Sequence, residues 1–108
     1  MAGVVPLDST LDGRRLTIGY REARAARPSL LLAAGETVKA HEFHWSRLES
    51  EPSLAEAAYE VVEREPSGEG FVRGATLASY LHLHFAAEAD GRLARRFVER
   101  AAAALVAA

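Results

Sequence analysis

The 108-residue chain contains no cysteine. Without thiols it can form neither disulfides nor thiolate metal sites, and any cysteine nucleophile has to come from another segment. An excess of one charge is also lacking, since 13 lysine and arginine residues stand against 15 aspartate and glutamate residues, for a formal net charge of -2. Nucleic-acid binding needs a basic surface, so we expect no nucleic-acid partner.

Long hydrophobic runs are missing too. The longest ones, SLLLAA and AAAALVAA, fall far short of the roughly 20 apolar residues that a membrane-spanning helix requires. A secretory leader has a basic region followed by an apolar run and a cleavage site, and the first residues do not show this pattern. We therefore expect a cytoplasmic protein with no membrane partner. The hydrophobic content of 49% suits one small domain with a modest core.

Alternating apolar side chains predict strands at residues 15–23 (RLTIGYREA), 36–47 (ETVKAHEFHWSR) and 58–64. A further strand end is expected at residues 1–6, and residues 25–35 read as a loop with some apolar packing. Turn-forming residues separate these stretches.

Within the second long stretch, successive side chains point to opposite faces. Glu42 and His44 are therefore expected on one face, and Phe43 and Trp45 on the other, which is the more apolar of the two.

Residues 76–85, TLASYLHLHF, predict a buried strand. We expect the rest of the chain to be arranged around it. On one continuous strand, Ala78, Tyr80, His82 and His84 share a face. Ligands of α/β proteins gather outside the carboxyl ends of strands, so the two histidines at this end are candidate site residues. The alternative is that both are hydrogen-bonded packing residues.

Residues 90–108 predict a helix, with Asp90 as the N-cap and Leu93, Phe97 and Leu105 at helical spacing. Arginines are expected to cover the opposite, solvated side. One helix and several strands indicate an α/β or α+β fold whose sheet is partly antiparallel. A single helix leaves one face of such a sheet uncovered, so the chain reads as a piece of a larger domain.

A metal site is one interpretation of the four histidines, which fall into two close pairs. The run HLHFAAE matches the HxHxxxE pattern of cupins. The glycine spacing of cupins is missing, however, and no third histidine follows. His41 and His44 would also point to opposite sides of their strand. We therefore expect no metal.

Two interpretations without a metal remain. Glu42 and His44 can be a buried polar pair, because a carboxylate beside an imidazole satisfies both groups. His82 can instead be a general base, because an imidazole takes a proton from a thiol and returns it to a leaving amine. The thiol would belong to another chain or segment.

The segments GYREA, HEFHWS and SYLHLHF occur in an order and spacing that resemble the C-terminal part of cobyrinate (or hydrogenobyrinate) a,c-diamide synthases. The matching stretches are LTIGYREA (16–23), AHEFHWSRLE (40–49), EGFVRGATLASYLHLHF (69–85) and a closing helix with ARRFVE. The resemblance spans nearly the whole chain. Any one of the three segments alone would be a weak signal, whereas together they are specific.

The resemblance implies a partial class I glutamine amidotransferase-like domain, α/β with a mixed sheet and a C-terminal helix, in which residues 1–108 form the C-terminal half. The family uses ATP, with Mg²⁺, and ammonia from glutamine to amidate corrin carboxylates in cobalamin biosynthesis. The family's glutaminase histidine corresponds to His82. The resemblance also implies that Glu42, His44 and, less directly, His84 contribute to the glutamine pocket.

The chain departs from the family in lacking a GxxxxGK[ST] phosphate loop, a nucleophile elbow and cysteine. Whereas the family is a glutamine-hydrolysing carbon–nitrogen ligase, we expect no cofactor on this chain and no activity from it alone. We expect instead a fragment that supplies a histidine to an upstream or partner segment carrying the phosphate loop and the cysteine. The alternative is a non-catalytic remnant or interaction module that retains part of the fold.

Overall fold

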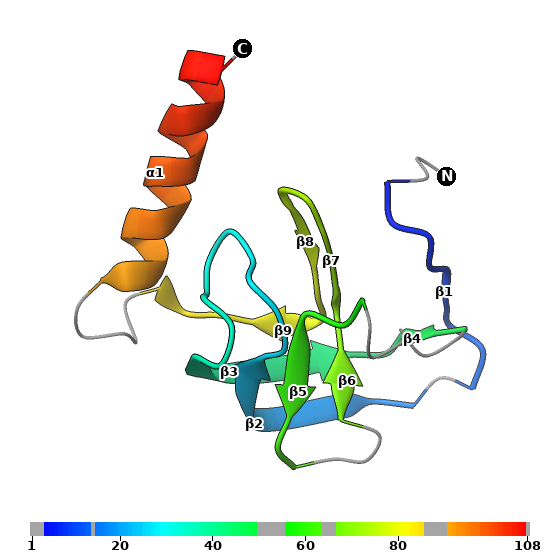
Figure 1. The fold of residues 1–108 in the computed structure, drawn as a ribbon. Helices are drawn as coiled ribbons and strands as arrows, with labels where there is room; N and C mark the ends of the chain where they lie inside the picture. Colours follow the sequence, from blue (N-terminus) through cyan, green and yellow to red (C-terminus); the bar gives the residue numbers. More distant parts are fainter. Residues whose placement is uncertain (1–3, 14, 50–55, 64–66, 86–90, 108) are drawn as a thin grey trace.

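The computed structural model describes residues 4–13, 15–49, 56–63, 67–85 and 91–107, and for residues 106–107 the backbone only. A curled sheet of five strands carries the fold, in the order β6-β5-β2-β3-β9 (Figure 1). Every strand pairing among the described residues is antiparallel. The predicted fold class, α/β with a C-terminal helix, is confirmed, whereas the sheet that was expected to be mixed is antiparallel in the described pairings. The strands of this sheet are β2 (Thr17–Ala25), β3 (Thr37–His44), β5 (Tyr59–Val61), β6 (Gly68–Glu69) and β9 (Leu81–His82).

The two long strands, β2 and β3, form the centre of the sheet and pair along eight residues from Thr17↔His44 to Arg24↔Thr37. One face of this pair buries small apolar side chains, among them Ala23, Val38 and Ala40. We call this the inner face, and the opposite one the outer face. The loop between β2 and β3 adds Leu31 and Leu32 to the core, as its apolar content predicted.

The predicted single strand over residues 76–85 is wrong. Residues Thr76–Ala78 form β8, which pairs with β7 (Phe71–Arg73) in a separate two-stranded hairpin, while β9 joins the main sheet. Ser79 and Tyr80 lie between β8 and β9 and belong to neither strand.

The carboxylate of Glu69 holds this break in the strand. Its Oε2 accepts a hydrogen bond from Ser79 Oγ at 2.6 Å, and its Oε1 accepts one from the backbone N–H of Tyr80 at 2.8 Å. Gly70, at φ +74°, lets the chain approach, because a Cβ there would lie 2.8 Å from the carbonyl oxygen of Ala78. A contact between segments ten residues apart therefore overrides the local alternation of TLASYLHLHF.

Two smaller predictions also change. Among the described residues 4–6, the expected strand end is a bend, and the first strand is β1 (Ser9–Thr10), which pairs with β4 (Arg47–Leu48). The strand expected at 58–64 is shorter in the structure, with β5 ending at Val61. The last residue of that expected strand lies outside the described residues.

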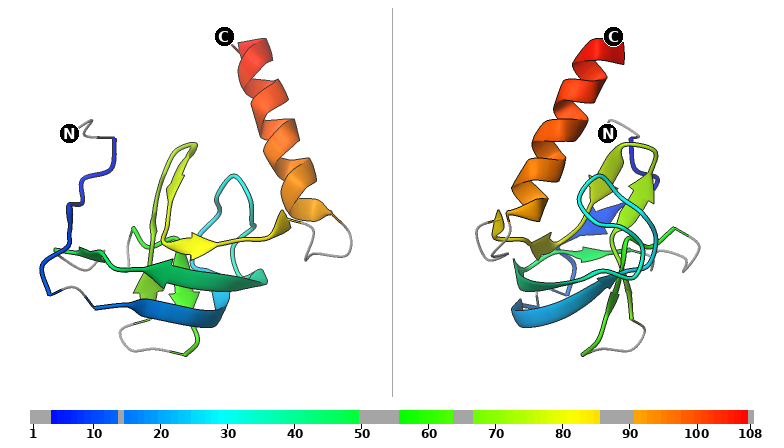
Figure 2. Two further views of the ribbon diagram at one scale, coloured as in Figure 1. Left: turned by 180° about the vertical axis from the view of Figure 1, so that it is seen from behind. Right: turned by 60° about the vertical axis from the view of Figure 1, so that its left-hand side comes forward.

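Helix α1 (Arg92–Ala107) confirms the predicted C-terminal helix, and the expected N-cap lies outside the described residues. Only its first turns contact the body: Leu93 is fully buried, and Phe97 packs on Phe85 with ring centroids 6.2 Å apart. From there the helix rises away from the sheet (Figures 1 and 2). No helix of the described chain is long and apolar enough to cross a membrane.

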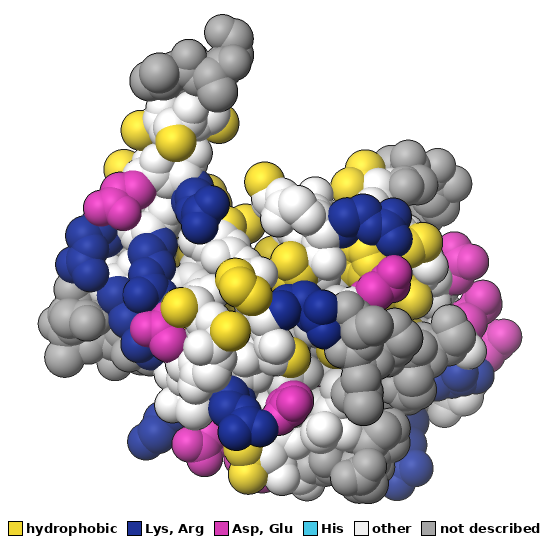
Figure 3. Space-filling view, in the orientation of Figure 1, with side chains coloured by type: hydrophobic (Ala, Val, Ile, Leu, Met, Phe, Trp, Pro, Cys, Tyr) yellow, Lys and Arg dark blue, Asp and Glu magenta, His cyan; other side chains and the backbone are white. Residues whose placement is uncertain are grey.

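Charged side chains attach α1 to the body, so the arginines do not all lie on a solvated side as the sequence predicted. Arg92 Nη1 lies 3.0 Å from Glu36 Oε2, and Arg96 Nη1 lies 2.5 Å from Glu36 Oε1. Arg96 also donates to the carbonyl oxygen of Leu31 at 3.0 Å. The Arg96 hydrogen bond, with a further one from the backbone N–H of Ala33, lowers the pKa of Glu36 to about 2. In Figure 3, lysine or arginine side chains gather at the base of the helix.

Candidate functional site

His82, the predicted base, projects from the outer face of the sheet and is exposed. In the β3–β9 ladder it pairs directly with His41, which in turn pairs with Tyr20 across the β2–β3 ladder. Residues opposite one another in an antiparallel ladder share a face. The ring centroids of His41 and His82 lie 6.3 Å apart, and those of Tyr20 and His41 lie 5.2 Å apart in an edge contact. Three strands thus place a row of three rings on one face.

Glu42 and His44 lie on the inner face and contact each other, as the alternation predicted. The Glu42 side chain is 1% exposed, and its Oε2 lies 2.8 Å from His44 Nε2. Its other oxygen accepts a hydrogen bond from Arg21 Nε at 3.0 Å. Burying a carboxylate costs free energy unless it is paired and hydrogen-bonded. Here Arg21 of β2 and His44 of β3 provide the hydrogen bonds.

His44 lies between two hydrogen-bond acceptors. Its Nδ1 faces the backbone carbonyl oxygen of Ser46 at 2.6 Å, and its Nε2 faces the Glu42 carboxylate. A carbonyl oxygen only accepts, so Nδ1 carries a proton and donates it. The second contact then requires a proton between Nε2 and the Glu42 oxygen as well. Charged hydrogen bonds to the Glu42 carboxylate therefore hold Arg21 and His44 in place on the inner face.

Tyr80 connects this group to the break between β8 and β9. Its ring stacks on His44, with centroids 3.8 Å apart and planes 11° from parallel. Its hydroxyl oxygen accepts a hydrogen bond from Ser46 Oγ at 3.0 Å, and its backbone N–H donates to Glu69. The segments GYREA, HEFHWS and SYLH thus meet in one polar cluster, which we call the inner cluster: Arg21, Glu42, His44, Ser46, Glu69, Ser79 and Tyr80.

The predicted face with Ala78, Tyr80, His82 and His84 together is wrong. The break at Ser79 and Tyr80 turns the Tyr80 ring to the inner face, whereas His82 points outward beside His41. His84 follows β9 and is exposed, and the described residues offer its ring no hydrogen bond. Of the sequence-predicted site residues, the structure brings Glu42 and His44 together and separates both from His82 by the thickness of the sheet.

The inner cluster and His82 lie within a range of the chain that matches a known family. Residues 1–90 match the CobB/CobQ-like glutamine amidotransferase domain. The chain belongs to this family.

Individual relatives are named as cobyrinate or hydrogenobyrinate a,c-diamide synthases. The chain is 45% identical over 101 residues to the hydrogenobyrinate a,c-diamide synthase of Streptomyces coelicolor, covering 93% of this chain and 20% of that protein. It is 46% identical over 90 residues to the cobyrinate a,c-diamide synthase of Salmonella typhimurium, covering 80% of this chain and 19% of that protein. The chain therefore spans about one fifth of these relatives. No solved structure matches it.

Sequence reasoning missed several residues of this amidotransferase chain. Arg21, Ser46 and Tyr80 lie inside the recognised segments, and Glu69 opens another, so their positions in the motifs were the available signal. His41 lies beside the predicted base only because of the β3–β9 register, which the sequence does not encode in any local pattern. No group of three histidine, aspartate or glutamate side chains within the described ranges is arranged to hold a metal ion.

A pocket of about 220 Å³ adjoins the inner cluster. Glu69, Ser79 and Tyr80 line it together with apolar residues that include Leu7 and Phe71. Its other lining residues come from the N-terminal segment, β4 and the β7–β8 hairpin.

Proposed function

We propose that residues 1–108 are a single, incomplete domain, the C-terminal half of the glutaminase domain of a cobyrinate or hydrogenobyrinate a,c-diamide synthase. The observation that carries the proposal is the position of His82: the histidine of the SYLH segment is exposed on the sheet, in a chain of the glutamine amidotransferase family. The names of the relatives support corrin amidation as the process served.

The reaction we infer needs a cysteine from a segment outside these residues. The imidazole of His82 takes the thiol proton, and the thiolate attacks the side-chain amide carbon of glutamine. The imidazolium returns its proton to the departing nitrogen, so that ammonia leaves and a thioester remains. Water then cleaves the thioester to glutamate and the free thiol. The ammonia goes on to amidate a corrin carboxylate.

ATP and Mg²⁺ are assigned to the segment with the phosphate loop, since this chain has no such loop. Glutamine is the nitrogen donor in this proposal, and the corrin carboxylate is bound by the partner segment. Glu42 and His44 lie on the other face from His82, so we assign them the shaping of the glutamine pocket through Tyr80 and the β8–β9 break. His84 lies two residues beyond His82, and we assign it to the rim of the same pocket.

The test is a reconstitution. The part of the Streptomyces coelicolor synthase that precedes the matched region supplies the cysteine, and glutamate release from glutamine is measured with and without this chain. We expect hydrolysis only when both are present, and a loss of at least about a hundredfold with His82→Ala, because a positioned general base contributes about 10²–10⁴-fold. Phe97→Ala, on α1, is the matched control for an aromatic substitution away from the site. Full hydrolysis with His82→Ala would contradict the proposal.

A further inference from the structure

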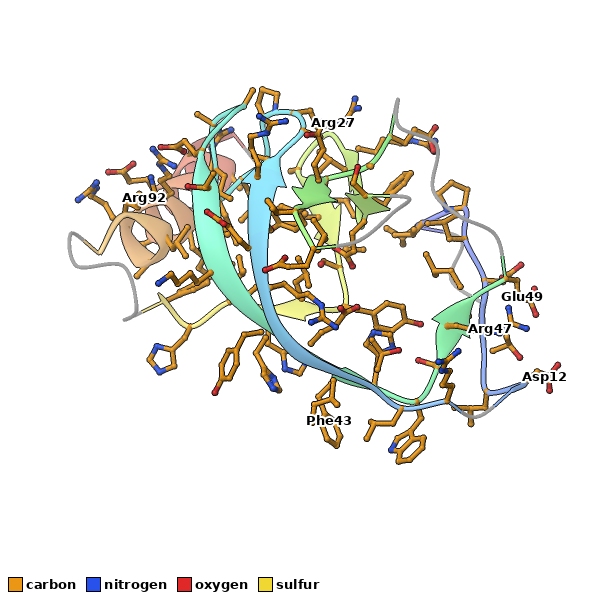
Figure 4. All side chains as sticks on the ribbon, turned by 90° about the horizontal axis from the view of Figure 1, so that it is seen from below. Asp12, Arg27, Phe43, Arg47, Glu49 and Arg92 are labelled. Carbon is orange, nitrogen blue, oxygen red and sulfur yellow. The ribbon has the colours of Figure 1, made fainter. Side chains whose placement is uncertain are left out.

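The outer face around His82 exposes large apolar side chains. Ile18 is 52% exposed, Tyr20 84%, Phe43 48% and Trp45 51%. Single exposed hydrophobic residues are ordinary on a protein surface, but a contiguous group is not. Figure 4 shows Phe43 pointing outward from the β2–β3 ribbon.

The ladder registers make these side chains one surface. Ile18 pairs with Phe43, Tyr20 with His41, and His41 with His82, so the members are direct cross-strand neighbours. Trp45 is the first residue after β3 and is also exposed. We call this the aromatic patch: Ile18, Tyr20, His41, Phe43, Trp45 and His82.

Charge divides the outer face into two parts. Glu22 and Lys39 pair directly opposite one another, next to the Tyr20–His41 pair, and Arg24 follows at the end of β2. Toward the other end of the same strands the outer face carries Ile18 and Phe43 and no charged partner in the ladder. A solvated sheet face would carry polar side chains along its whole length. The aromatic patch instead has the composition of an interface core beside a polar rim.

We propose that the aromatic patch is the docking surface for the polypeptide segment that carries the nucleophilic cysteine, an inference that rests on the proposed function. A thiol has to come within about 3 Å of a His82 nitrogen to lose its proton to it. His82 projects from the outer face, and the inner face beneath it is occupied by the core and the inner cluster. The thiol therefore approaches from the outer side, where its carrier covers the patch.

The size of the relatives fits this occupant. The match covers 20% of the Streptomyces coelicolor synthase and 19% of the Salmonella typhimurium synthase, so about four fifths of each lies outside it. A partner of that size can bury the roughly 800 Å² per side of a standard interface. Its contact surface should be apolar opposite Phe43 and Trp45, and should carry the cysteine opposite His82.

Trp45 is the only tryptophan of the chain and lies in the patch, so it reports on docking directly. The chain is labelled with 5-fluorotryptophan and titrated with the part of the Streptomyces coelicolor synthase that precedes the matched region. We expect a saturable change of the fluorine resonance and reduced accessibility of Trp45 to a soluble quencher. This measurement uses the parent chain and needs no substitution.

Substitutions then locate the surface. Phe43→Ser and Ile18→Ser should each raise the Kd by about tenfold or more, as for central interface residues. Val62→Ser and Leu105→Ser are matched controls, because these side chains are 65% and 80% exposed but lie outside the patch. They should change the Kd by less than about twofold, since surface apolar residues outside an interface contribute little. Circular dichroism and thermal unfolding confirm that each variant is folded.

The outcomes separate this inference from the proposed function. Docking at the patch without glutamine hydrolysis would sink the proposed function and leave the docking surface standing. Hydrolysis that depends on His82, with an unchanged Trp45 signal and parental binding by Phe43→Ser and Ile18→Ser, would overturn the docking surface alone. A fluorine shift that depends on the concentration of this chain, without the added segment, would assign the patch to a second copy and contradict the proposal. No binding of the segment would contradict it as well.

Discussion

The rings of His44 and Tyr80 stack face to face, with centroids 3.8 Å apart and planes 11° from parallel. The contact joins the end of β3 to the break between β8 and β9, two residues before His82. Because Glu69 and Ser46 hold Tyr80 at its backbone and hydroxyl, the stack fixes the path of the chain into β9. The position of the exposed His82 imidazole on the outer face thus depends on the inner cluster.

A double-mutant cycle measures this contact. His44→Leu, Tyr80→Leu and the double variant are unfolded in urea, and the coupling free energy is expected to be about 0.5–1.5 kcal/mol, the range for aromatic pairs. The same cycle with His44 and Phe97, which lies on α1, is the control and should give a coupling near zero. Additive effects of His44→Leu and Tyr80→Leu would show that the stack contributes nothing to stability.

Gly70→Ala tests the close approach of the chain at the β8–β9 break. Here φ is +74° and the new Cβ would lie 2.8 Å from the carbonyl oxygen of Ala78. We expect a loss of about 2 kcal/mol or more in the free energy of unfolding, from backbone strain and the clash together. Gly35→Ala is the matched control, because φ is +86° but no atom lies within 4 Å of its new Cβ. Equal losses at both positions would mean that the approach to Ala78 carries no cost.

The ion pairs of Glu36 make the attachment of α1 depend on pH. Arg96 and the N–H of Ala33 lower the pKa of Glu36 from 4.5 to about 2 in the folded chain. A carboxyl with a lowered folded-state pKa stabilises the fold above its unfolded pKa, and this stability is lost as the pH falls from about 4.5 through about 2.

Glu36→Gln should therefore lower the free energy of unfolding by about 1 kcal/mol at pH 7, a value reduced for partial exposure of the pair. The difference from the parent chain should shrink toward zero between pH 4.5 and 2, as followed by urea unfolding at each pH. Glu99→Gln, which removes an exposed carboxylate on α1, is the control and should show no such trend. A constant difference across this pH range would contradict the role of the ion pairs.

The two long strands could be predicted because alternation in LTIGYREA and VKAHEFH is a local signal that the β2–β3 ladder preserves. The same signal failed at TLASYLHLHF, where Glu69 and Gly70 bend the chain from outside the stretch. Glu42 and His44 were predicted as neighbours because they are two residues apart on one strand. The partners Arg21 and Tyr80 were not, because their proximity depends on ladder register and on the break, which are tertiary features.

The outer face also could be predicted only in part from the sequence. Phe43 and Trp45 were predicted to share the more apolar face, and in the structure that face is the exposed one. Local hydrophobicity indicates that a face needs covering, but it does not say whether the same chain covers it.

The isolated chain should not hydrolyse glutamine. It has no thiol to form the thioester, and an imidazole alone does not replace it. Purified protein is incubated with glutamine, and ammonia is measured against a buffer blank, with the His82→Ala protein prepared in parallel. Ammonia release by the parent chain that is absent from the His82→Ala preparation would show a reaction that the account does not contain.

The most direct test of the account is the ratio of glutamine-supported to ammonia-supported amidation in the complex of this chain with a cysteine-bearing segment. Free ammonia bypasses the thioester, so removal of the general base should affect only the reaction with glutamine. We expect His82→Ala to lower the ratio by at least about a hundredfold, and His84→Ala to lower it much less. If His84→Ala lowers the ratio and His82→Ala leaves it intact, the base is the other histidine. An unchanged ratio in both variants would contradict the glutaminase role of this chain.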